Sequence, residues 1–307
     1  MERSAEELLI FIFDEILPKH GMALRVKQKE LSLEMLEALQ EDKLALCEAE
    51  VGTGKTHAYI LALTVHNLYS DKKAPAIIST STIALQKALT EEYIPQISGI
   101  LLEHHVIDRP LSFVVRKGKK HYACDSRLAI YEASIKNLKR ETDAGLLLEL
   151  AKLRGQEDDR IDLDDTALTS YVKARINVFR CSSSCPVRRL CRYMDFQKRC
   201  MTENYDFQIT NHNYVLADLI GRKQGKKPLF PVYGAVVLDE AHKLLDAARQ
   251  MYSTVWEEQD AELIAKLSMV NGRRLKTDEL AVLQGRAMED SRQIFDRLAG
   301  ELAGSHT

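Results

Sequence analysis

The feature that most constrains the fold is a glycine-rich octapeptide, Ala49–Thr56, which reads AEVGTGKT. It follows the short apolar run 44–47 and precedes a helical pattern that continues to about Ser70. Gly52 and Gly54 let backbone N–H groups turn inward around phosphate oxygens, because neither residue has a Cβ in the way. The order predicts a phosphate-binding loop (P-loop) between a buried strand and a helix, with Ala49 where the motif usually begins with glycine.

The loop residues have separate chemical tasks. The backbone of Gly52, Thr53 and Gly54 is expected to cradle the phosphates of ATP, assisted by the positive end of the following helix. Lys55 is expected to reach the β- and γ-phosphates, and the Thr56 hydroxyl to ligate Mg²⁺. The sequence therefore assigns 52–56 to ATP binding and gives Lys55 a catalytic role.

An acidic tetrapeptide, Asp239–His242, directly follows the apolar run 235–238. A carboxylate at the end of such a strand can hold the Mg²⁺ shell, which is the role expected for Asp239. The adjacent Glu240 can orient and deprotonate the attacking water. Paired with the P-loop, this motif predicts an Mg²⁺-dependent ATPase.

Apolar runs and helical spacing alternate along the rest of the core. The runs 75–79, 111–115 and 207–210 predict strands, while 1–43 and 83–89 have helical spacing. This order predicts an α/β fold whose parallel sheet is covered by helices. The segment 243–307 is expected to be helical and highly charged. Its expected packing positions are Leu263, Ile264, Leu267, Leu280, Leu283, Ile294 and Leu298.

Between about 116 and 204 the pattern changes to basic clusters, five of the six cysteines, and the polar, helical stretches 141–153 and 155–165. We interpret this region as an insertion into the α/β core. Four thiolates suffice for either a tetrahedral zinc or a 4Fe–4S cluster. The candidate ligands are Cys124, Cys181, Cys185 and Cys191. Cys47 and Cys200 are expected to be small buried residues.

Basic residues surround these cysteines and favour an anionic cluster, a phosphate backbone, or simply a solvated surface. The net charge of −2, from 43 Lys+Arg and 45 Asp+Glu, does not exclude nucleic acid, because local clustering matters more than the sum. Apolar runs such as 8–13 are too short for a membrane span, and the start of the chain is unlike a secretory signal. The sequence predicts a cytoplasmic location and no membrane partner.

Taken in order, the motifs resemble the N-terminal half of an iron–sulfur superfamily 2 DNA helicase of the DinG/XPD type. The matching segments are Arg25–Gln28, Ile77–Gln86, Lys117–Cys124, Cys185–Cys191, Thr210–Leu216 and Asp239–His242. The resemblance implies a RecA-like P-loop NTPase, adenine recognition by Gln28, and a 4Fe–4S cluster on the four cysteines. It also implies that His242 couples the nucleotide site to DNA. The expected DNA contacts are Thr82, Gln86, Lys117, Lys119 and Lys120.

The resemblance also predicts a domain organisation. The first part of motor domain 1 is expected at 1–115, the iron–sulfur insertion at 116–204, the return to motor domain 1 at 205–245, and the start of a helical arch at 246–307. Motifs of a second motor domain do not follow Asp239–His242, so that domain is predicted to be absent. Weak nucleotide binding and poor hydrolysis by the isolated chain are therefore expected.

Three functions remain open from the sequence. The first is an ATP-dependent helicase moving 5′-to-3′ on single-stranded or forked DNA, represented by its first motor half. The second is a cluster-stabilised, single-strand-binding subunit of a split or degenerate motor, with a second polypeptide supplying motor domain 2. The third is a zinc-stabilised ATP-binding fold with no role on DNA.

Overall fold

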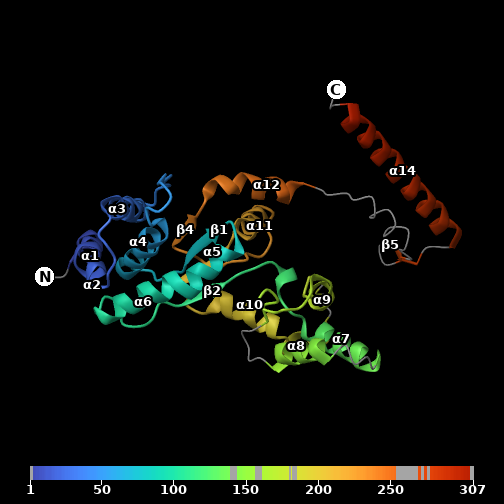
Figure 1. The fold of residues 1–307 in the computed structure, drawn as a ribbon, viewed down its shortest axis with the longest axis horizontal. Helices are drawn as coiled ribbons and strands as arrows, with labels where there is room; N and C mark the ends of the chain where they lie inside the picture. Colours follow the sequence, from blue (N-terminus) through green and yellow to red (C-terminus); the bar gives the residue numbers. More distant parts are fainter. Residues whose placement is uncertain are drawn as a thin grey trace. The chain divides into compact units, whose positions relative to one another are not determined.

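The computed structural model describes residues 3–138, 144–155, 161–179, 181, 185–253, 269–270, 273–274 and 277–304. The chain divides into two compact units, Met1–Met251 and Tyr252–Thr307, which are described separately. Figure 1 shows the order of the elements along the chain.

The first unit is built on a four-stranded, all-parallel sheet with the order β2-β3-β1-β4. The strands are β1 (Ala76–Thr80), β2 (Phe113–Val115), β3 (Phe207–Asn211) and β4 (Ala235–Leu238). Ala76 pairs with Phe207 on one side and Ala235 on the other, so three strands run in register through the centre. This architecture confirms the predicted α/β class and is compatible with a RecA-like fold.

Helices precede and interleave with the strands. The N-terminal ones are α1 (Ala5–Phe11), the π-helical turn η1 (Ile12–Ile16), α2 (Leu17–Lys19) and α3 (Val26–Gln40). Next come α4 (Lys55–Tyr69), α5 (Ile83–Ala88), the π-helical turn η2 (Leu89–Tyr93) and α6 (Ile94–Glu103). After β3 and β4 come α11 (His212–Lys223), the 3₁₀ turn η6 (Ala241–Lys243) and α12 (Leu244–Tyr252), which ends at the boundary between the units. The predicted helices at 1–43, 55–70 and 83–89 are confirmed.

The period-2 alternation of β1 divides its side chains between two hydrophobic clusters. Ile78 joins the main cluster, to which α1, α3, α4 and α6 contribute, while Ile77 packs on the other face with Val215 and Phe230. Because α4 lies within the main cluster, its residues 58–65 are all buried. The sheet is therefore covered on both faces, as a parallel sheet requires.

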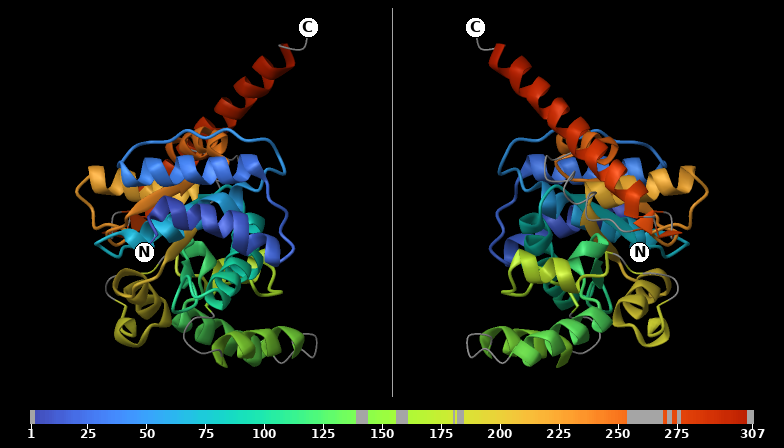
Figure 2. Two further views of the ribbon diagram at one scale, coloured as in Figure 1. Left: turned by 90° about the vertical axis from the view of Figure 1, so that its left-hand side faces the viewer. Right: turned by 90° about the vertical axis from the view of Figure 1, so that its right-hand side faces the viewer.

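The segment that leads into the P-loop differs from expectation. Residues 43–50 form no strand, and Leu44 and Leu46 are 99% and 91% exposed. Figure 2 shows this stretch as an extended blue loop along the surface. A strand needs a neighbour for its backbone groups, and no described strand pairs with this segment. The prediction of a buried strand at 44–47 is wrong, as is that of a buried Cys47, which is only partly buried.

The insertion is mostly helical. Its elements are the 3₁₀ turn η3 (Lys119–His121), α7 (Asp125–Leu138), α8 (Ala144–Gly155), α9 (Ser170–Ile176), the 3₁₀ turn η5 (Arg188–Leu190) and α10 (Arg192–Thr202). The helix predicted at 141–153 is confirmed where it is described. The helix predicted at 155–165 is wrong for 161–165, because Asp162 instead pairs with Tyr122 in an antiparallel bridge. Residues 156–160 lie outside the described part.

The second unit contains the antiparallel pair β5 (Met269–Val270) and β6 (Arg273–Arg274), and the long helix α14 (Thr277–Gly304). On α14, Leu283, Ile294 and Leu298 are about half exposed, and Leu280 is partly buried. The other predicted packing positions, 263, 264 and 267, lie outside the described residues.

Candidate functional site

The P-loop adopts a conformation that only glycine adopts without strain at two positions. Gly52 has φ +87° and Gly54 has φ +88°, both in the left-handed region. A Cβ on Gly54 would lie 2.0 Å from Nε2 of Gln28, so any side chain at this position would displace the Gln28 amide from the loop. Gly54 is the N-cap residue of α4, which aims the positive end of that helix at the loop. This geometry suits an anion-binding turn.

Two side chains of the Arg25–Gln28 segment hold the loop. Arg25 donates from Nη1 to the Gly52 carbonyl oxygen at 2.6 Å, and Gln28 donates from Nε2 to that of Gly54 at 2.8 Å. Gln28 is 8% exposed, so its amide is largely committed to the loop backbone. The sequence pattern marked this segment but gave Arg25 no task of its own.

Lys55 lies at the first position of α4 and bends back across the loop, where Nζ donates to the Ala49 carbonyl oxygen at 2.9 Å. Its charge also acts on Asp239, because it is one of the groups that lower the pKa of that carboxyl. The lysine of the P-loop and the first acid of the second motif are thus brought together from distant parts of the sequence.

Tyr59 provides the direct link between the two motifs. Its hydroxyl donates to Oδ2 of Asp239 at 3.4 Å, and the side chain of Thr56, one helical turn earlier, acts on the pKa of the same hydroxyl. Tyr59 is 2% exposed, and burial together with Asp239 raises its pKa far above the ordinary value. No sequence motif marked Tyr59. The available signal was an aromatic hydroxyl three positions after Thr56, on the same face of the helix.

The acidic turn begins where β4 ends. The backbone N–H of Asp239 donates to the Ser79 carbonyl oxygen at 2.8 Å, which fixes the carboxylate at the carboxyl edge of the sheet. Burial raises the pKa of Asp239, and the neighbouring Glu240 raises it further. Glu240 has φ +56°, an uncommon conformation for a residue with a side chain, and its carboxylate lies 3.4 Å from Nδ1 of His242.

A buried histidine that the sequence analysis did not single out lies beneath this turn. Nδ1 of His212 is 2.8 Å from the Ser79 hydroxyl, and its ring lies beside the backbone of Asp239 and Glu240. The residue is 3% exposed, and burial lowers its pKa, which favours the neutral ring. His212 therefore helps to fix the acidic turn through β1.

The residues predicted to contact DNA lie in different environments. Thr82 is exposed and caps α5 by accepting a hydrogen bond from the Leu85 N–H at 3.2 Å. Gln86 is only 2% exposed, and both polar atoms of its side chain have no hydrogen-bond partner among the described residues. Lys119 and Lys120 are exposed on η3.

Lys117 does not fit the predicted surface role. Its side chain is 7% exposed and its ammonium lies between the carboxylates of Asp162 and Asp164, the latter at 3.0 Å. Both acids lie in the stretch where the sequence pattern suggested a helix. Because the charge of Lys117 is already neutralised inside the protein, we correct its assignment from a DNA contact to an internal ion pair.

Three of the four candidate cysteine ligands border one hydrophobic cluster. Cys124, Cys181 and Cys191 pack against residues that include Tyr122 and Phe196. Cys124 immediately precedes α7, and Cys191 is the N-cap residue of α10. The residues that follow them in the chain are joined by an ion pair, in which Arg192 Nη2 lies 2.6 Å from Asp125 Oδ1.

The sulfur spacing and the remaining cysteine add two further observations. Among the described residues, no three of the four candidate sulfurs lie within 4.8 Å of one another. A tetrahedral zinc with Zn–S bonds of about 2.3 Å would hold its sulfurs roughly 3.8 Å apart. Cys200 is fully buried, and burial raises the pKa of its thiol to about 11, as expected for a packing residue.

Comparison with curated proteins finds relatives over most of the chain. The chain is 27% identical to the ATP-dependent DNA helicase YoaA of Escherichia coli over 76% of its length, which covers 35% of that protein. It is 26% identical to the probable ATP-dependent helicase YpvA of Bacillus subtilis, with 96% and 46% covered. It is also 26% identical to the 3′-5′ exonuclease DinG of Staphylococcus saprophyticus, with 91% and 28% covered.

The sequence is related to the DinG-type helicases. The chain spans between about a quarter and a half of the length of these DinG-type relatives. No family model matches the sequence. Among the described helices, none is both long enough and apolar enough to cross a membrane.

Proposed function

We propose that this chain is the ATP-binding part of a DNA helicase motor, corresponding to motor domain 1 of the DinG-type relatives. The observation that carries the proposal is the contact of Tyr59 with both Thr56 and Asp239, which unites the P-loop and the acidic turn. A P-loop alone occurs in many proteins. Its junction with a carboxylate at a strand end is what Mg²⁺-dependent phosphoryl transfer needs.

In this proposal the backbone of 52–54 binds the ATP phosphates, and Lys55 turns from Ala49 toward the β- and γ-phosphates. Thr56 and Asp239 hold Mg²⁺, which when bound neutralises phosphate charge. Glu240 orients and deprotonates the attacking water. The adenine-side role proposed for Gln28 requires its amide to leave the Gly54 carbonyl, to which it is now bonded.

Nucleotide binding tests this part directly. We expect Lys55→Ala to weaken the binding of a fluorescent ATP analogue with Mg²⁺ by at least about tenfold, because a charge-assisted contact to phosphate contributes about 1.5–3 kcal/mol. Lys43→Ala is the matched control, since that exposed lysine pairs with Glu41 near the start of the same loop. Equal affinity of the two variants would reject the site.

We also infer that rapid hydrolysis requires a second motor domain, in the same protein or on a second polypeptide. Charges contributed across a cleft between two domains accelerate phosphoryl transfer by orders of magnitude. The isolated chain is therefore expected to hydrolyse ATP slowly, with little stimulation by DNA. Robust, DNA-stimulated turnover by the 307-residue chain would contradict this inference. We propose that movement along DNA in the 5′-to-3′ direction, and the coupling of the nucleotide site to DNA by His242, are properties of this complete, two-domain motor.

Single-stranded or forked DNA is the proposed partner, with Lys119 and Lys120 as phosphate contacts on the insertion and Thr82, the N-cap residue of α5, as a further contact. For single strands, each phosphate contact that is lost reduces the salt dependence, the slope of log K against log salt, by about 0.7. We expect Lys119→Glu to reduce that slope and lower affinity, while Lys72→Glu, an exposed control, leaves both unchanged. Unchanged DNA binding by the Lys119→Glu variant at low salt would rule out Lys119 as a DNA contact.

We propose a 4Fe–4S cluster on Cys124, Cys181, Cys185 and Cys191. Two features of the described cysteines fit a 4Fe–4S cluster. Cys124 and Cys191 stand at helix N-termini, which favour anions, and among the described residues no three of the four sulfurs are gathered as closely as a zinc ion would hold them. Such a cluster, when bound, would cross-link the insertion through its thiolates.

Metal content decides between a cluster and zinc. Anaerobically purified protein is expected to be coloured and to contain iron and acid-labile sulfide, and Cys185→Ser is expected to lose both. Cys47→Ser, which alters a cysteine of the P-loop approach, is the matched control and should keep them. Colourless protein with stoichiometric zinc and no iron would reject the cluster.

A second candidate function is a single-strand-binding subunit without helicase activity of its own. The exposed Lys119 and Lys120 favour it, because they lie on the insertion rather than in the nucleotide site. The two functions differ in coupling: a motor changes its DNA affinity with the bound nucleotide, whereas a clamp does not. Equal DNA affinity with ATP, with ADP and without nucleotide would favour the clamp.

A further inference from the structure

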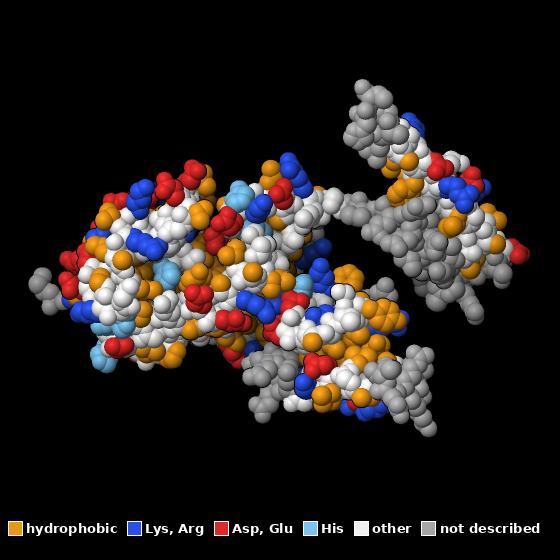
Figure 3. Space-filling model, viewed as in Figure 1, with side chains coloured by type: hydrophobic (Ala, Val, Ile, Leu, Met, Phe, Trp, Pro, Cys, Tyr) orange, Lys and Arg blue, Asp and Glu red, His pale blue; other side chains and the backbone are white. Residues whose placement is uncertain are grey.

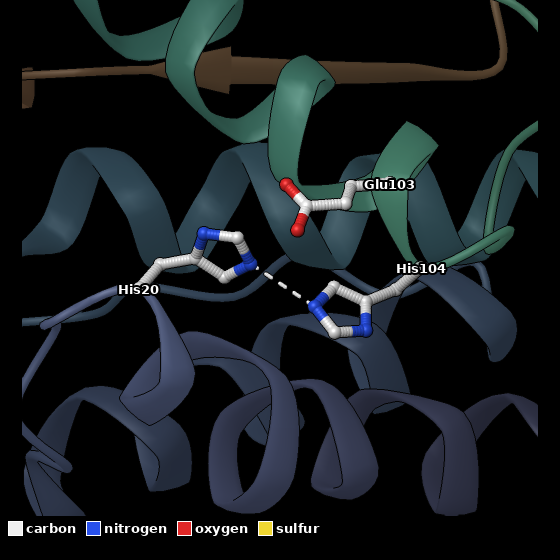
Figure 4. Close-up of side chains that lie close together, drawn as sticks. All are labelled: His20, Glu103 and His104. Carbon is white, nitrogen blue, oxygen red and sulfur yellow. Dashed lines mark hydrogen bonds between the residues drawn. The ribbon is translucent and has the colours of Figure 1, made fainter.

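Two histidines far apart in the sequence meet at the ends of two helices. His20 follows α2 and His104 follows α6, and their Nε2 atoms lie 3.0 Å apart with the rings at 83°. The carboxylate of Glu103 reaches the same space (Figure 4). One ligand atom from each of the three side chains lies within 4.8 Å of the other two. In the described part of the chain, this is the only such group of three metal-ligating side chains.

The backbone fixes these positions before any ion binds. The His20 N–H donates to the Leu17 carbonyl oxygen at 3.0 Å, and the His104 N–H donates to that of Ile100 at 3.2 Å. Leu17 and Ile100 both belong to the main hydrophobic cluster, so the two helix ends are anchored in one core. Both rings are partly buried, whereas Glu103 is exposed and can be approached from solvent.

Two Nε2 atoms that face each other cannot both be donors in a hydrogen bond, so one ring must present a lone pair. A divalent metal in place of the shared proton uses a lone pair from each ring. With Zn–N bonds of about 2.0–2.1 Å, a tetrahedral ion holds its two nitrogens roughly 3.3 Å apart. The observed separation therefore needs to widen by only a few tenths of an ångström.

The donor set selects the class of ion. Imidazole nitrogens suit zinc and other late first-row metals, whereas Mg²⁺ and Ca²⁺ take oxygen ligands. Two histidines and one carboxylate leave the fourth tetrahedral position for water. We propose that His20, Glu103 and His104 form a zinc site that links the N-terminal helices to α6. This site lies outside both the P-loop and the cysteine-rich insertion.

Cobalt distinguishes this site from the cysteines. Co²⁺ bound by thiolates gives strong charge-transfer absorption, whereas Co²⁺ bound by imidazole and carboxylate gives only weak visible bands. We expect wild-type protein to bind one more Co²⁺ than His20→Ala or His104→Ala, and the difference spectrum to contain weak bands alone. His66→Ala, which removes a partly buried histidine on α4, is the matched control and should bind as wild type.

Glu103→Gln keeps the test decisive where a histidine variant does not fold, because Glu103 is exposed. Loss of this ligand is expected to weaken Zn²⁺ binding at the site by at least about tenfold. Mutating a residue that only hydrogen-bonds to a metal ligand already lowers metal affinity by about that factor. Zn²⁺ should also raise the Tm of wild-type and His66→Ala protein more than that of Glu103→Gln. Equal Co²⁺ uptake and equal Zn²⁺ affinity in wild-type and Glu103→Gln protein would overturn the proposal.

Discussion

In α4, the residues from 58 to 65 are all buried, and the hydrophobic ones from Tyr59 onward pack with the sheet in one large cluster. The buried side chains that join the insertion to the same sheet are of another kind. Arg116 is 1% exposed and donates to four neutral oxygens, on Gln197, Gln208, Tyr214 and Leu229. Lys117, the next residue, is also buried and is paired with two partly buried carboxylates.

The difference matters because apolar burial and buried charge respond differently to change. Apolar contacts are non-directional, and their contribution falls in proportion to the area removed. A buried charge pair adds little net stability when complete, yet it is strongly destabilising when one partner is lost. The core should therefore tolerate small substitutions that the base of the insertion does not.

The insertion also exposes hydrophobic side chains on α7, α8 and α9, including Ile130, Leu148 and Tyr171. Hydrophobic side chains are visible on the surface of this part of the chain in Figure 3.

The largest effect is expected for Lys117→Met. It leaves Asp162 and Asp164 without their cation, which should lower the free energy of unfolding by about 3–5 kcal/mol. Urea denaturation followed by circular dichroism measures this. Lys119→Met, a change to an exposed lysine two positions away, is the control and should stay within about 0.5 kcal/mol. Similar values for the two variants would mean that the base of the insertion is not held by this ion pair.

Arg192→Gln should have a smaller effect. The substitution removes the contact with Asp125 and a hydrogen bond to the Leu153 carbonyl oxygen, so we expect a loss of about 1.5–3 kcal/mol. Because Arg192 and Asp125 directly follow two candidate cysteine ligands, iron content should also fall. Arg189→Gln, on the exposed turn η5, should change neither property. If stability falls but iron content does not, the ion pair stabilises the fold without supporting the proposed cluster.

The ion pair of Lys117 also predicts a pH dependence. The two carboxylates raise the pKa of Lys117 above 10.5, against an opposing effect of burial, so its contribution is complete below pH 10.5 and is lost as the pH rises through the folded pKa. Hydrogen bonds from His121 and Lys117 outweigh burial and lower the pKa of Asp164 below 3.8, so its contribution is lost as the pH falls through that lowered pKa. Asp162, whose pKa is raised chiefly by burial, opposes the acid loss.

The stability difference between wild type and Lys117→Met should therefore be constant from about pH 5 to 10 and shrink at higher pH. Urea denaturation of both proteins from pH 4 to 11 measures this difference. A difference that stays constant through pH 11 would contradict the proposed role of the lysine.

The smallest effect is expected in the core. Ile60 is fully buried on α4, and Ile60→Val removes one methylene group, which should cost about 0.5–1.5 kcal/mol. Nucleotide affinity should not change, because this residue packs in the hydrophobic cluster rather than against the P-loop. A loss above that range, in the same urea experiment, would mean that the core is as intolerant as the base of the insertion.

The sequence predicts those elements whose local pattern agrees with their tertiary surroundings. Apolar runs predict the strands at 76–80 and 207–211, and helical spacing predicts the helix from Lys55. The glycines of the P-loop indicate a turn with positive φ, which Gly52 and Gly54 adopt. The position of Asp239 at the carboxyl edge of the sheet could be anticipated, because it follows the apolar run 235–238 and parallel strands present their carboxyl ends at one edge. What lies between the motifs could not: Tyr59 reads as an ordinary helix residue.

The errors have a common physical origin. Leu44 and Leu46 belong to a short apolar run typical of a strand, but strand formation depends on a partner that local sequence does not specify. Lys117 lies within a basic run that reads as surface, and only folding brings Asp162 and Asp164 to it. In both cases the deciding interaction comes from distant residues.

The extended loop before the P-loop has a consequence for hydrogen exchange. Its backbone amides at 43–49 lie outside the ladder of the sheet, whereas those of α4 begin immediately after Gly54 in a buried helix. Amide protons of the loop should exchange with solvent deuterium in seconds, while those of 58–65 should exchange only through extensive unfolding. The proposed nucleotide site therefore lies on a sharp boundary of local stability, with the glycine turn at 52–54 joined on one side to a helix buried in the core.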